Sequence, residues 1–382
     1  MQAFILAGGF ATRLWPLTEK RAKPLLPLAG KPLLTHLVEK IPEGMPVTVS
    51  TNAVFAKDFA SWKSEIRNLK SEANPKHEIR ILIEDTGHED EKLGALGAVA
   101  KWITEEKIDD DVLLLAGDNY IGFSIAEFLQ AYTGNPLLAA YDVHDLEKAK
   151  RLGTIVTDVP FPHPPTPSPT GGRGEEKQTT KHIHSLPPTG EGLGMGEKEE
   201  KKQVIRSFEE KSPSPRSTLV STGCFVFPAS VLPTLVSFAK EKPDNIGGIF
   251  EHFLKRGTPV ECIAFTEPWF DIGSFEAYLE ATKALVGNAV LAGQGHGQGH
   301  GNIFEGSVVL GKNSKVERST IRNVVLFEDC DITDCILENC ILDNRCVLRG
   351  VDLSGKMLRE GTTLVRKSEA RNPKSETNAK YE

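Results

Sequence analysis

Long apolar runs are absent from this sequence of 382 residues. No stretch approaches the roughly 18 consecutive apolar residues that a membrane-spanning helix needs, so we expect no membrane span. The N-terminus enters a strand-like segment directly, without the charged and apolar regions of a secretory signal, so we also expect no signal peptide. From these two absences we predict a cytoplasmic protein.

An excess of basic residues is absent as well. The 45 lysines and arginines are outnumbered by 52 aspartates and glutamates, which gives a formal net charge of −7. This balance argues against general nucleic-acid binding. Six cysteines are present, but without a secretory signal a disulfide framework is not expected. The length suggests two domains.

The two standard glycine-rich nucleotide motifs, G-x-G-x-x-G and the P-loop, are missing from the N-terminal segment. Instead, a buried-strand pattern over residues 3–6 breaks at Gly8-Gly9 and is followed by Arg13 and Lys23. A glycine pair lets the backbone approach a ligand and point N–H groups at it. Arginine and lysine supply fixed positive charge for phosphates. The loop therefore indicates a phosphate-binding site.

Strand-like and helix-like segments alternate over about the first 285 residues. This alternation predicts a Rossmann-like, mostly parallel sheet covered on both faces, with ligands bound beyond the carboxyl ends of the strands. The expected strands are residues 2–7, 47–51, 79–84, 112–116, 137–141, 153–157, 204–211, 218–227 and 260–264. One expected helix opens at Pro32, and the others cover residues 93–104, 125–132, 229–240, 249–255 and 275–285.

Three segments lack this alternation. Residues 160–202 are rich in Pro, Gly, Thr and Glu, and we expect a disordered insertion because they cannot bury enough apolar surface. Residues 286–302 contain a Gly/Gln/His repeat that is typical of a flexible linker. Residues 366–382 are polar and of mixed charge, so we expect a disordered tail.

Residues 303–365 repeat an apolar or cysteine position every five to six residues, marked by Cys330, Cys335, Cys340 and Cys346. This pattern resembles a short left-handed parallel β-helix of the hexapeptide type. Cysteine is small enough to stack inside such a coil. The spacing is not that of a standard zinc finger, so we favour packing over zinc binding.

Two aspartates follow strand-like segments that lie far apart in the chain. Asp118 comes directly after residues 112–116, and Asp271 follows Trp269-Phe270. Mg²⁺ takes hard oxygen ligands, typically one or two carboxylates together with phosphates and water, so the pair is a candidate cation site. The alternative for Asp118 is a helix N-cap.

Residues 6–34 fit the pattern GG-x-x-[ST]-R-L-x-P-L-T followed by K-P, and residues 269–274 fit W-x-D-[IT]-G-[ST]. On these motifs the chain resembles the sugar-1-phosphate nucleotidyltransferases, and within them the glucose-1-phosphate thymidylyltransferase group. The resemblance covers residues 1–159 and 204–285 and implies a nucleotidyltransferase domain over 1–285. The chain departs from the motifs at Ser274-Phe275, where Thr-Pro is common, and at Ser212, which displaces a proline by one position.

The resemblance also implies a role for each matching residue. The family's catalytic arginine and lysine correspond to Arg13 and Lys23, and its two metal ligands to Asp118 and Asp271. The nucleotide-binding residues implied are Ala7, Gly8, Gly9, Thr12, Glu84 and Gly94. The residues implied to bind the sugar phosphate are Glu210, Lys211, Thr222 and Gly223.

The cues for the base conflict. The segment LGALGAV around Gly94 and Gly97 is closer to the guanylyl- and adenylyltransferase form, whereas GDN at 117–119 and residues 139–155 resemble the thymidylyltransferase group. Glu84 is the expected base contact, and Gly94 and Gly97 are expected to let the base lie against the backbone.

The resemblance predicts Mg²⁺-dependent transfer of a nucleotidyl group from an NTP to a sugar 1-phosphate, with pyrophosphate as the second product. Glucose 1-phosphate with dTTP or UTP is the first prediction, and mannose 1-phosphate with GTP is the second. A catalytically inactive regulatory subunit is a further alternative. Residues 303–365 contain no histidine that would serve acetyl transfer, so we expect the β-helix to serve assembly or regulation. We also expect a homo-oligomer.

Overall fold

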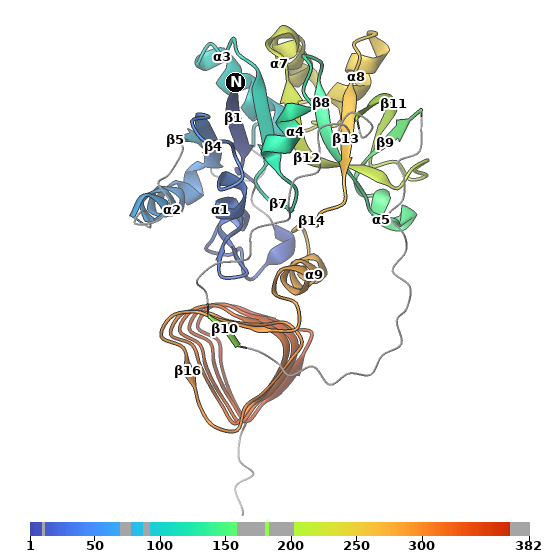
Figure 1. The fold of residues 1–382 in the computed structure, drawn as a ribbon. Helices are drawn as coiled ribbons and strands as arrows, with labels where there is room; N and C mark the ends of the chain where they lie inside the picture. The colour runs from blue at the N-terminus through green and yellow to red at the C-terminus, as the bar shows by residue number, and fades with distance from the viewer. Residues whose placement is uncertain (10–11, 69–77, 87–91, 159–179, 183–201, 367–382) are drawn as a thin grey trace, which may run out of the picture. The chain divides into compact units, whose positions relative to one another are not determined.

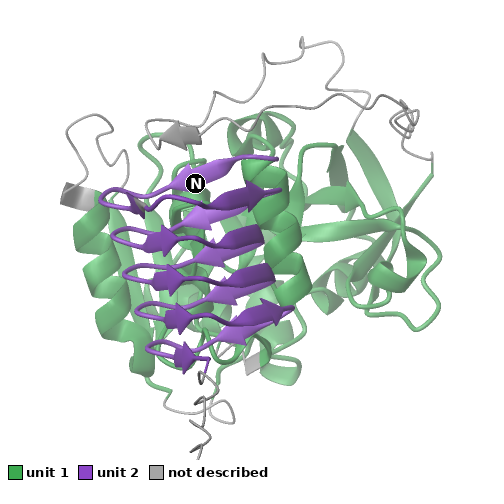
Figure 2. Ribbon diagram, turned by 90° about the horizontal axis from the view of Figure 1, so that it is seen from below, with its two compact units in different colours: residues 1–177, 183–287 green, residues 178–182, 288–382 purple. Residues whose placement is uncertain are grey.

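The computed structural model describes residues 1–9, 12–68, 78–86, 92–158, 180–182 and 202–366. The chain divides into two compact units, which Figure 2 shows in different colours. Unit 1 contains residues 1–177 and 183–287, and unit 2 contains residues 178–182 and 288–382. Most of the expected insertion and nearly all of the expected tail lie outside the described residues.

Unit 1 is built on a nine-stranded sheet with the order β5-β4-β1-β6-β12-β8-β13-β11-β9 (Figure 1). The neighbours β5, β4, β1 and β6 are all parallel, and β8 and β13 form another parallel pair. The predicted α/β, mostly parallel fold is therefore confirmed. The strands are β1 Gln2–Leu6, β4 Val47–Asn52, β5 Ile79–Glu84, β6 Val112–Ala116, β8 Leu137–Asp142, β9 Gly153–Thr157, β11 Lys202–Glu210, β12 Leu219–Phe227 and β13 Glu261–Phe265.

Two hydrophobic cores cover the two faces of this sheet. Along β1 the side chains alternate, so that Ala3 and Ile5 enter one core and Phe4 enters the other. The first core contains apolar side chains of α1, α2 and α4, and the second those of α3, α7 and α8. Phe4 stacks on Trp102 of α3 at a centroid distance of 4.4 Å, and both rings are at most 1 % exposed. Burial of each such side chain contributes about 1.5–3 kcal/mol.

Helices α1, α3, α4, α7, α8 and α9 lie close to the predicted segments, whereas α2 and α5 were not predicted. Ser274 accepts a hydrogen bond from the Ala277 N–H at 3.1 Å and caps α9, as a threonine at this position would. The helices are α1 Leu33–Val38, α2 Ala56–Asn68, α3 Ala95–Glu105, α4 Ile125–Gln130, α5 Leu146–Ala149, α7 Leu232–Glu241, α8 Gly248–Lys255 and α9 Phe275–Val286. Short 3-10 turns are η1 Thr12–Leu14, η2 Lys23–Leu25, η3 Ala53–Phe55 and η5 Ala229–Val231.

Two small antiparallel sheets accompany the large one. β7 (Asn119–Ile121) pairs with β14 (Trp269–Asp271) in a register that places Asn119 opposite Asp271. The second small sheet joins β2 (Pro27–Leu28) to β3 (Lys31–Pro32). The first pairing ties the end of β6 to a segment much later in the chain, and it positions the functional site.

Unit 2 is a parallel β-helix whose coils have three sides (Figure 1) and stack on one another (Figure 2). Over most of its length each residue pairs with the residue 16 positions later, as Thr320 does with Ile336 and Ile336 with Asp352. The predicted left-handed β-helix fold is confirmed. The strands are β10 Thr180–His182, β15 Val290–Ala292, β16 Gly297–Gln298, β17 Ile303–Glu305, β18 Val308–Leu310, β19 Lys315–Glu317, β20 Thr320–Leu326, β21 Asp331–Thr333, β22 Ile336–Leu342, β23 Val347–Arg349, β24 Asp352–Ser354, β25 Met357–Leu358 and β26 Thr363–Val365.

Residues with positive φ turn the corners between the three faces. They form three columns along the helix axis: Gly295, Asn313, Asp329, Arg345 and Gly361; Gly301, Arg318, Asp334 and Gly350; and Gly306, Asn323, Asn339 and Gly355. The four cysteines of this unit follow such corner residues directly, and each is at most 1 % exposed. They are free thiols packed inside the coils, and among the described residues no group of three or more His, Cys, Asp or Glu side chains is arranged to hold a metal ion.

Two expected segment boundaries differ from the structure. Residues 286–302, expected as a linker, supply β15 and β16, and Gly295 and Gly301 turn corners of the first coil. Residues 180–182 of the expected insertion form β10, which pairs in parallel with β15. Glycines that suggest flexibility in the sequence here occupy corner positions where their positive φ is required.

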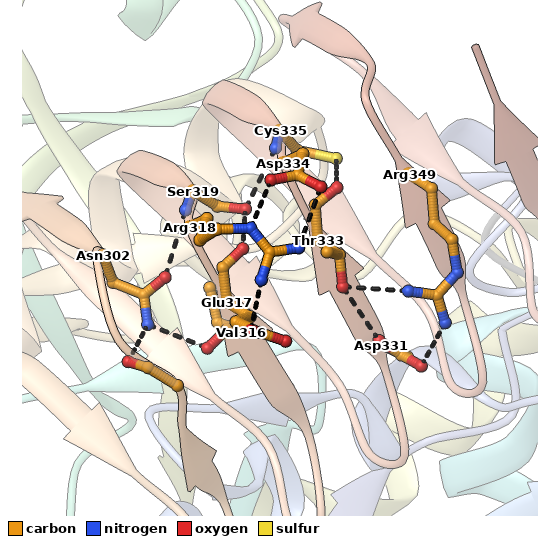
Figure 3. Close-up of polar contacts among 11 residues, drawn as sticks. Asn302, Val316, Glu317, Arg318, Ser319, Asp331, Thr333, Asp334, Cys335 and Arg349 are labelled. Carbon is orange, nitrogen blue, oxygen red and sulfur yellow. Dashed lines mark hydrogen bonds and ion pairs between the residues drawn. The ribbon is translucent and has the colours of Figure 1, made fainter. Parts of the chain in front are cut away.

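The outer surface of the β-helix carries ion pairs between successive coils (Figure 3). Arg318 donates to Asp334 at 2.7 Å, and Arg349 donates to Asp331 at 2.7 Å. These charges are therefore matched by neighbours within the repeat. Separately, none of the helices in the described part of the chain has the length and apolarity needed to cross a membrane.

Candidate active site

A cavity of about 490 Å³ opens in unit 1 beyond the carboxyl ends of β1 and β6. Its size falls within the range of small-molecule sites. Ten of the residues singled out in the sequence line it: Ala7, Gly9, Arg13, Lys23, Asp118, Glu210, Lys211, Thr222, Gly223 and Asp271. The fold therefore brings together residues from four distant parts of the chain.

The first loop is fixed at its start by backbone and side-chain contacts. The Ala7 N–H donates to Ser50 O at 3.1 Å, and Asn52 Nδ2 donates to Gly8 O at 3.0 Å. A Cβ at Gly8 would lie 3.1 Å from Glu84 Oε1, whereas a Cβ at Gly9 would meet no atom within 4 Å. Gly8 is thus required for close packing, and Gly9 leaves its backbone open to the cavity. For Thr12 only the backbone, in η1, is described.

Lys23 lies between the two aspartates. Its Nζ donates to Asp118 Oδ2 at 2.8 Å and to Asp271 Oδ1 at 3.5 Å. The Lys23 side chain is 9 % exposed, whereas each aspartate side chain is 43 % exposed. The pairing of β7 with β14 explains why the two carboxylates meet, and the Ile272 N–H donates to Asp118 O at 3.2 Å. Asp118 caps no helix, so the alternative N-cap interpretation is wrong.

The pKa values of the two carboxyl groups shift in opposite directions. Burial alone would raise the pKa of Asp118, but the Lys23 ammonium outweighs it and the pKa is lowered. Burial and the neighbouring Asp118 charge raise the pKa of Asp271, and Lys23 opposes this only partly. Asp118 therefore keeps its negative charge to a lower pH than Asp271 does.

Glu210 and Lys211 lie at the end of β11, next to the start of β9. The two side chains form an ion pair at 3.7 Å, and burial raises the pKa of Glu210. A Cβ at Gly247 would lie 1.8 Å from Glu210 Oε2, and one at Gly153 would lie 3.1 Å from the same atom. Only glycine at these two positions leaves room for the Glu210 carboxylate on the cavity wall.

Thr222 and Gly223 contribute mainly through the backbone. The Thr222 hydroxyl donates to Ala139 O at 2.9 Å, and Thr222 O accepts from Trp269 Nε1 at 2.9 Å. Thr222 itself is fully buried. Gly223 has a φ of +74°, and a Cβ there would lie 2.7 Å from the Ala116 Cβ. This pair shapes the wall beside the end of β6.

Three of the described residues predicted to bind the nucleotide, Gly8, Glu84 and Gly94, do not line the cavity itself. Glu84 is 6 % exposed beneath Gly8, and burial raises its pKa while Ser50 and Lys101 oppose this. Gly94 faces the chain: a Cβ there would lie 2.6 Å from the Pro243 carbonyl group. Its neighbour Ala95 lines the cavity in its place.

Several lining residues were missed by the sequence reasoning. Arg151 lies in the turn before β9, Gly153 is the first residue of β9, and Gly247 is the N-cap residue of α8 next to Glu210. The Gly247-Gly248 pair was a visible signal for a close approach. Nothing in the local sequence distinguished Arg151 from the other basic residues near it.

The donor set suits Mg²⁺. Asp118 and Asp271 offer hard carboxylate oxygens, and both carboxylates already contact one positive charge, the Lys23 ammonium. Both aspartate side chains are also open to the cavity. Two carboxylates are the number that Mg²⁺ commonly takes from a protein when phosphates and water complete its shell.

A sequence profile of the nucleotidyl transferase family matches residues 2–167 and 178–287. The chain therefore belongs to the nucleotidyl transferase family. It is 22 % identical over 288 residues to the bifunctional protein GlmU of Methanocaldococcus jannaschii, a match that covers 75 % of this chain and 54 % of that protein. It is 30 % identical over 160 residues to the UTP–glucose-1-phosphate uridylyltransferase AglF of Haloferax volcanii, covering 41 % of this chain and 60 % of that one.

A third relative is a putative mannose-1-phosphate guanyltransferase of Sulfolobus acidocaldarius, 26 % identical over 158 residues, with 41 % of each chain covered. The matches thus span between two fifths and three fifths of these relatives' lengths. Among solved structures, a putative glucose-1-phosphate thymidylyltransferase from Bacillus anthracis aligns with a TM-score of 0.49 and 20 % identity, over 74 % of this chain and 93 % of that one.

Proposed function

We propose that the protein transfers a nucleotidyl group from an NTP to a sugar 1-phosphate and releases pyrophosphate. One observation carries the proposal: Arg13, Lys23, Asp118, Asp271 and the Glu210-Lys211 pair all line one cavity of about 490 Å³. A nucleotidyl transfer needs positive charge for a triphosphate, oxygen ligands for a cation and a separate site for the second substrate. The cavity offers groups suited to each of these needs.

The reaction that fits is an in-line displacement. A phosphate oxygen of the sugar 1-phosphate forms a bond to the α-phosphorus of the NTP, and the bond from that phosphorus to the bridging oxygen breaks as pyrophosphate leaves. In this proposal Arg13 neutralises charge that develops on the leaving phosphates, and Lys23 holds a phosphate oxygen. The backbone at Ala7, Gly8 and Gly9 approaches the nucleotide, with Thr12 in the same loop.

The second substrate binds on the β9–β11 side. Glu210 accepts hydrogen bonds from sugar hydroxyls, and Lys211 contacts the sugar phosphate. Gly153 and Gly247 support this assignment because they leave space at the Glu210 carboxylate. The Thr222-Gly223 backbone forms the wall between this site and the end of β6.

Asp118 and Asp271 would hold Mg²⁺. Bound there, the cation would neutralise charge on the phosphates of the reacting groups. The 43 % exposure of each aspartate side chain leaves oxygen atoms accessible from the cavity.

Glucose 1-phosphate with dTTP or UTP is the substrate pair we propose first. The resemblance of residues 117–119 and 139–155 to the thymidylyltransferase group supports it, and so does the relative named as a UTP–glucose-1-phosphate uridylyltransferase. Mannose 1-phosphate with GTP is the second candidate, supported by the LGALGAV segment and by the relative named as a guanyltransferase.

Two other functions are less well supported. The first is a regulatory subunit without activity. Such a subunit would not require two carboxylates that each lie within 3.5 Å of a lysine Nζ in a cavity. Acetyl transfer by the β-helix would need a base. Residues 303–365 contain no histidine, although the first coil of the β-helix holds His296 and His300. We propose instead that unit 2 mediates homo-oligomer formation, which light scattering on the purified protein would test.

Pyrophosphate release tests the proposal. The purified protein is incubated with Mg²⁺, one of dTTP, UTP, GTP or ATP, and either glucose 1-phosphate or mannose 1-phosphate. Release that requires both substrates, with one pair preferred, supports the proposal and identifies the base and the sugar. Release from an NTP without any sugar phosphate, or no release together with no NTP binding, contradicts it.

A further inference from the structure

Arg151 is a lining residue of the cavity to which neither the sequence motifs nor the family resemblance assigns a role. It lies in the turn between α5 and β9. Backbone hydrogen bonds hold this turn: the Arg151 N–H donates to Lys148 O at 3.2 Å, and the Leu152 N–H donates to Ala149 O at 3.0 Å. The position of its backbone on the cavity wall is therefore set by the fold.

The turn is also joined to the end of β11. The Lys211 N–H donates to Leu152 O at 3.1 Å, which continues the pairing of Gly153 with Glu210. Arg151 and Lys211 thus leave the paired ends of β9 and β11 as near neighbours. Both line the cavity, next to the Glu210 carboxylate.

The charge pairing of these cations differs. Lys211 forms an ion pair with Glu210 at 3.7 Å, and the nearby basic residues Lys148 and Lys150 pair with Glu280 and Glu147. Within the part of the chain that the structure describes, the Arg151 guanidinium has no ion pair or hydrogen bond. Its five N–H donors are therefore not used by other described residues.

The four lining cations fall into two sets along the sheet. Arg13 and Lys23 follow β1, whereas Arg151 and Lys211 lie at β9 and β11, at the other end of the strand order. The first set lies with the two aspartates, and the second lies with Glu210 alone. A single lysine already paired with a glutamate neutralises little of a phosphate dianion, so the second set needs another cation.

We propose that Arg151 binds the phosphate group of the sugar 1-phosphate, together with Lys211. A guanidinium can donate two parallel hydrogen bonds to one phosphate, which an ammonium cannot do with the same geometry. This inference rests on the proposed function and adds a second phosphate-binding residue to it. In the product the same phosphate is the one next to the sugar, so Arg151 contacts the NDP-sugar as well.

The test compares Arg151→Gln with wild type, using the substrate pair that gives the highest pyrophosphate release. We expect KM for the sugar 1-phosphate to rise about 10- to 100-fold, the effect of losing a charge-assisted hydrogen bond, while KM for the NTP stays within about twofold. In the reverse direction KM for the NDP-sugar rises and KM for pyrophosphate does not. Arg151→Lys should recover part of the loss because it restores the charge without the paired donors.

Arg206→Gln is the matched control. Arg206 lies on β11, pairs with Asp158 and does not line the cavity. Its substitution by glutamine therefore removes the same charge from the same region of the protein. Both variants should keep the wild-type unfolding temperature. A fall in sugar-phosphate affinity that is equal in both variants would reduce the effect of Arg151 to long-range electrostatics and overturn the inference.

Two further results would contradict it. Unchanged kinetics in Arg151→Gln would show that the guanidinium contacts no substrate, and a rise in KM for the NTP and pyrophosphate instead would place it on the leaving group. Calorimetric titration of glucose 1-phosphate into wild type and Arg151→Gln separates this inference from the proposed function. If wild type binds glucose 1-phosphate and turns over, and Arg151→Gln binds it equally well, the Arg151 assignment alone is wrong. If wild type neither binds glucose 1-phosphate nor reacts, both the Arg151 assignment and the proposed function are wrong.

Discussion

The charged side chains of the two units are placed and paired differently. In unit 1, Lys23, Asp118 and Asp271 come from distant segments and meet in a cavity. In unit 2, Arg318 and Asp334 pair across successive coils on the outer surface, each about half exposed. The cavity cluster brings like charges close together and depends on tertiary structure, whereas the surface pairs are satisfied within a repeat. This difference indicates that the chemistry lies in unit 1.

Asp271→Asn should produce the largest effect. Removing one carboxylate takes away a candidate metal ligand and leaves Lys23 with a single anionic partner, so we expect turnover to fall by at least about 10³-fold. The unfolding temperature should change little because the side chain is open to the cavity. Steady-state pyrophosphate release and a thermal melt measure the two quantities. Asp334→Asn in unit 2 is the matched control, and near-normal turnover in Asp271→Asn would remove Asp271 from the metal site.

Ile332→Ala should produce the next largest effect, on stability alone. Ile332 is fully buried inside the β-helix, and its truncation should cost about 2–4 kcal/mol of unfolding free energy for unit 2. Ile336→Ala removes the same atoms from a side chain that is 51 % exposed and should cost under about 1 kcal/mol. Urea denaturation followed by circular dichroism compares the two. Equal losses would contradict the burial of the β-helix core, and a loss of turnover per folded molecule in either variant would link unit 2 to the chemistry.

Glu84→Gln should have a smaller effect that depends on pH. The pKa of Glu84 is raised in the folded protein, chiefly by burial, so the ionised carboxylate destabilises the fold. The penalty is absent at low pH, where the group is protonated in both states, and develops as the pH rises through its ordinary pKa to the raised value. We therefore expect Glu84→Gln to gain about 1 kcal/mol over wild type at about pH 8 and nothing at about pH 4. Stability measured at both pH values checks this, and a gain of equal size at both would be inconsistent with it.

Arg318→Gln should have the smallest effect. The residue is 51 % exposed and its ion pairs with Asp334 and Glu317 lie in solvent, where screening leaves little net stabilisation. We expect no measurable change in unfolding temperature or turnover. A clear loss of stability that disappears at high salt would show that the ion pairs between successive coils stabilise the β-helix cooperatively.

The sequence predicts most of the sheet because its central strands are strongly apolar. Residues 112–116 are both predicted and observed as β6, and the predicted residues 137–141 form all but the last residue of β8. Helix α2 escaped prediction because only Phe59, Trp62 and Ile66 mark its apolar side within a polar segment. The first coil of the β-helix was also missed, since glycine in a corner and glycine in a linker look the same in sequence.

The candidate site was predictable where a motif marks it. Arg13, Lys23, Asp118 and Asp271 belong to recognisable motifs, and the structure places all four on one cavity. Arg151 lies in residues 139–155, where the resemblance assigns it no role, and Gly247 belongs to no motif. Their positions depend on the pairing of β9 with β11 and on the packing of α8 against Glu210. Long-range pairing of this kind leaves no local signal. The roles of all these residues stay predictions until the kinetic tests are made.

The contacts of Lys23 also bear on how the protein forms during synthesis. Its two carboxylate partners lie 95 and 248 positions further along the chain. At about 5–20 residues per second, a ribosome needs roughly ten seconds or more after making Lys23 before it adds Asp271. A nascent chain that already contains β1, β4, β5 and β6 therefore still lacks one of its two candidate metal ligands. The proposed nucleotidyl transfer would therefore begin only after β14 has been synthesised, and incomplete chains would be inactive.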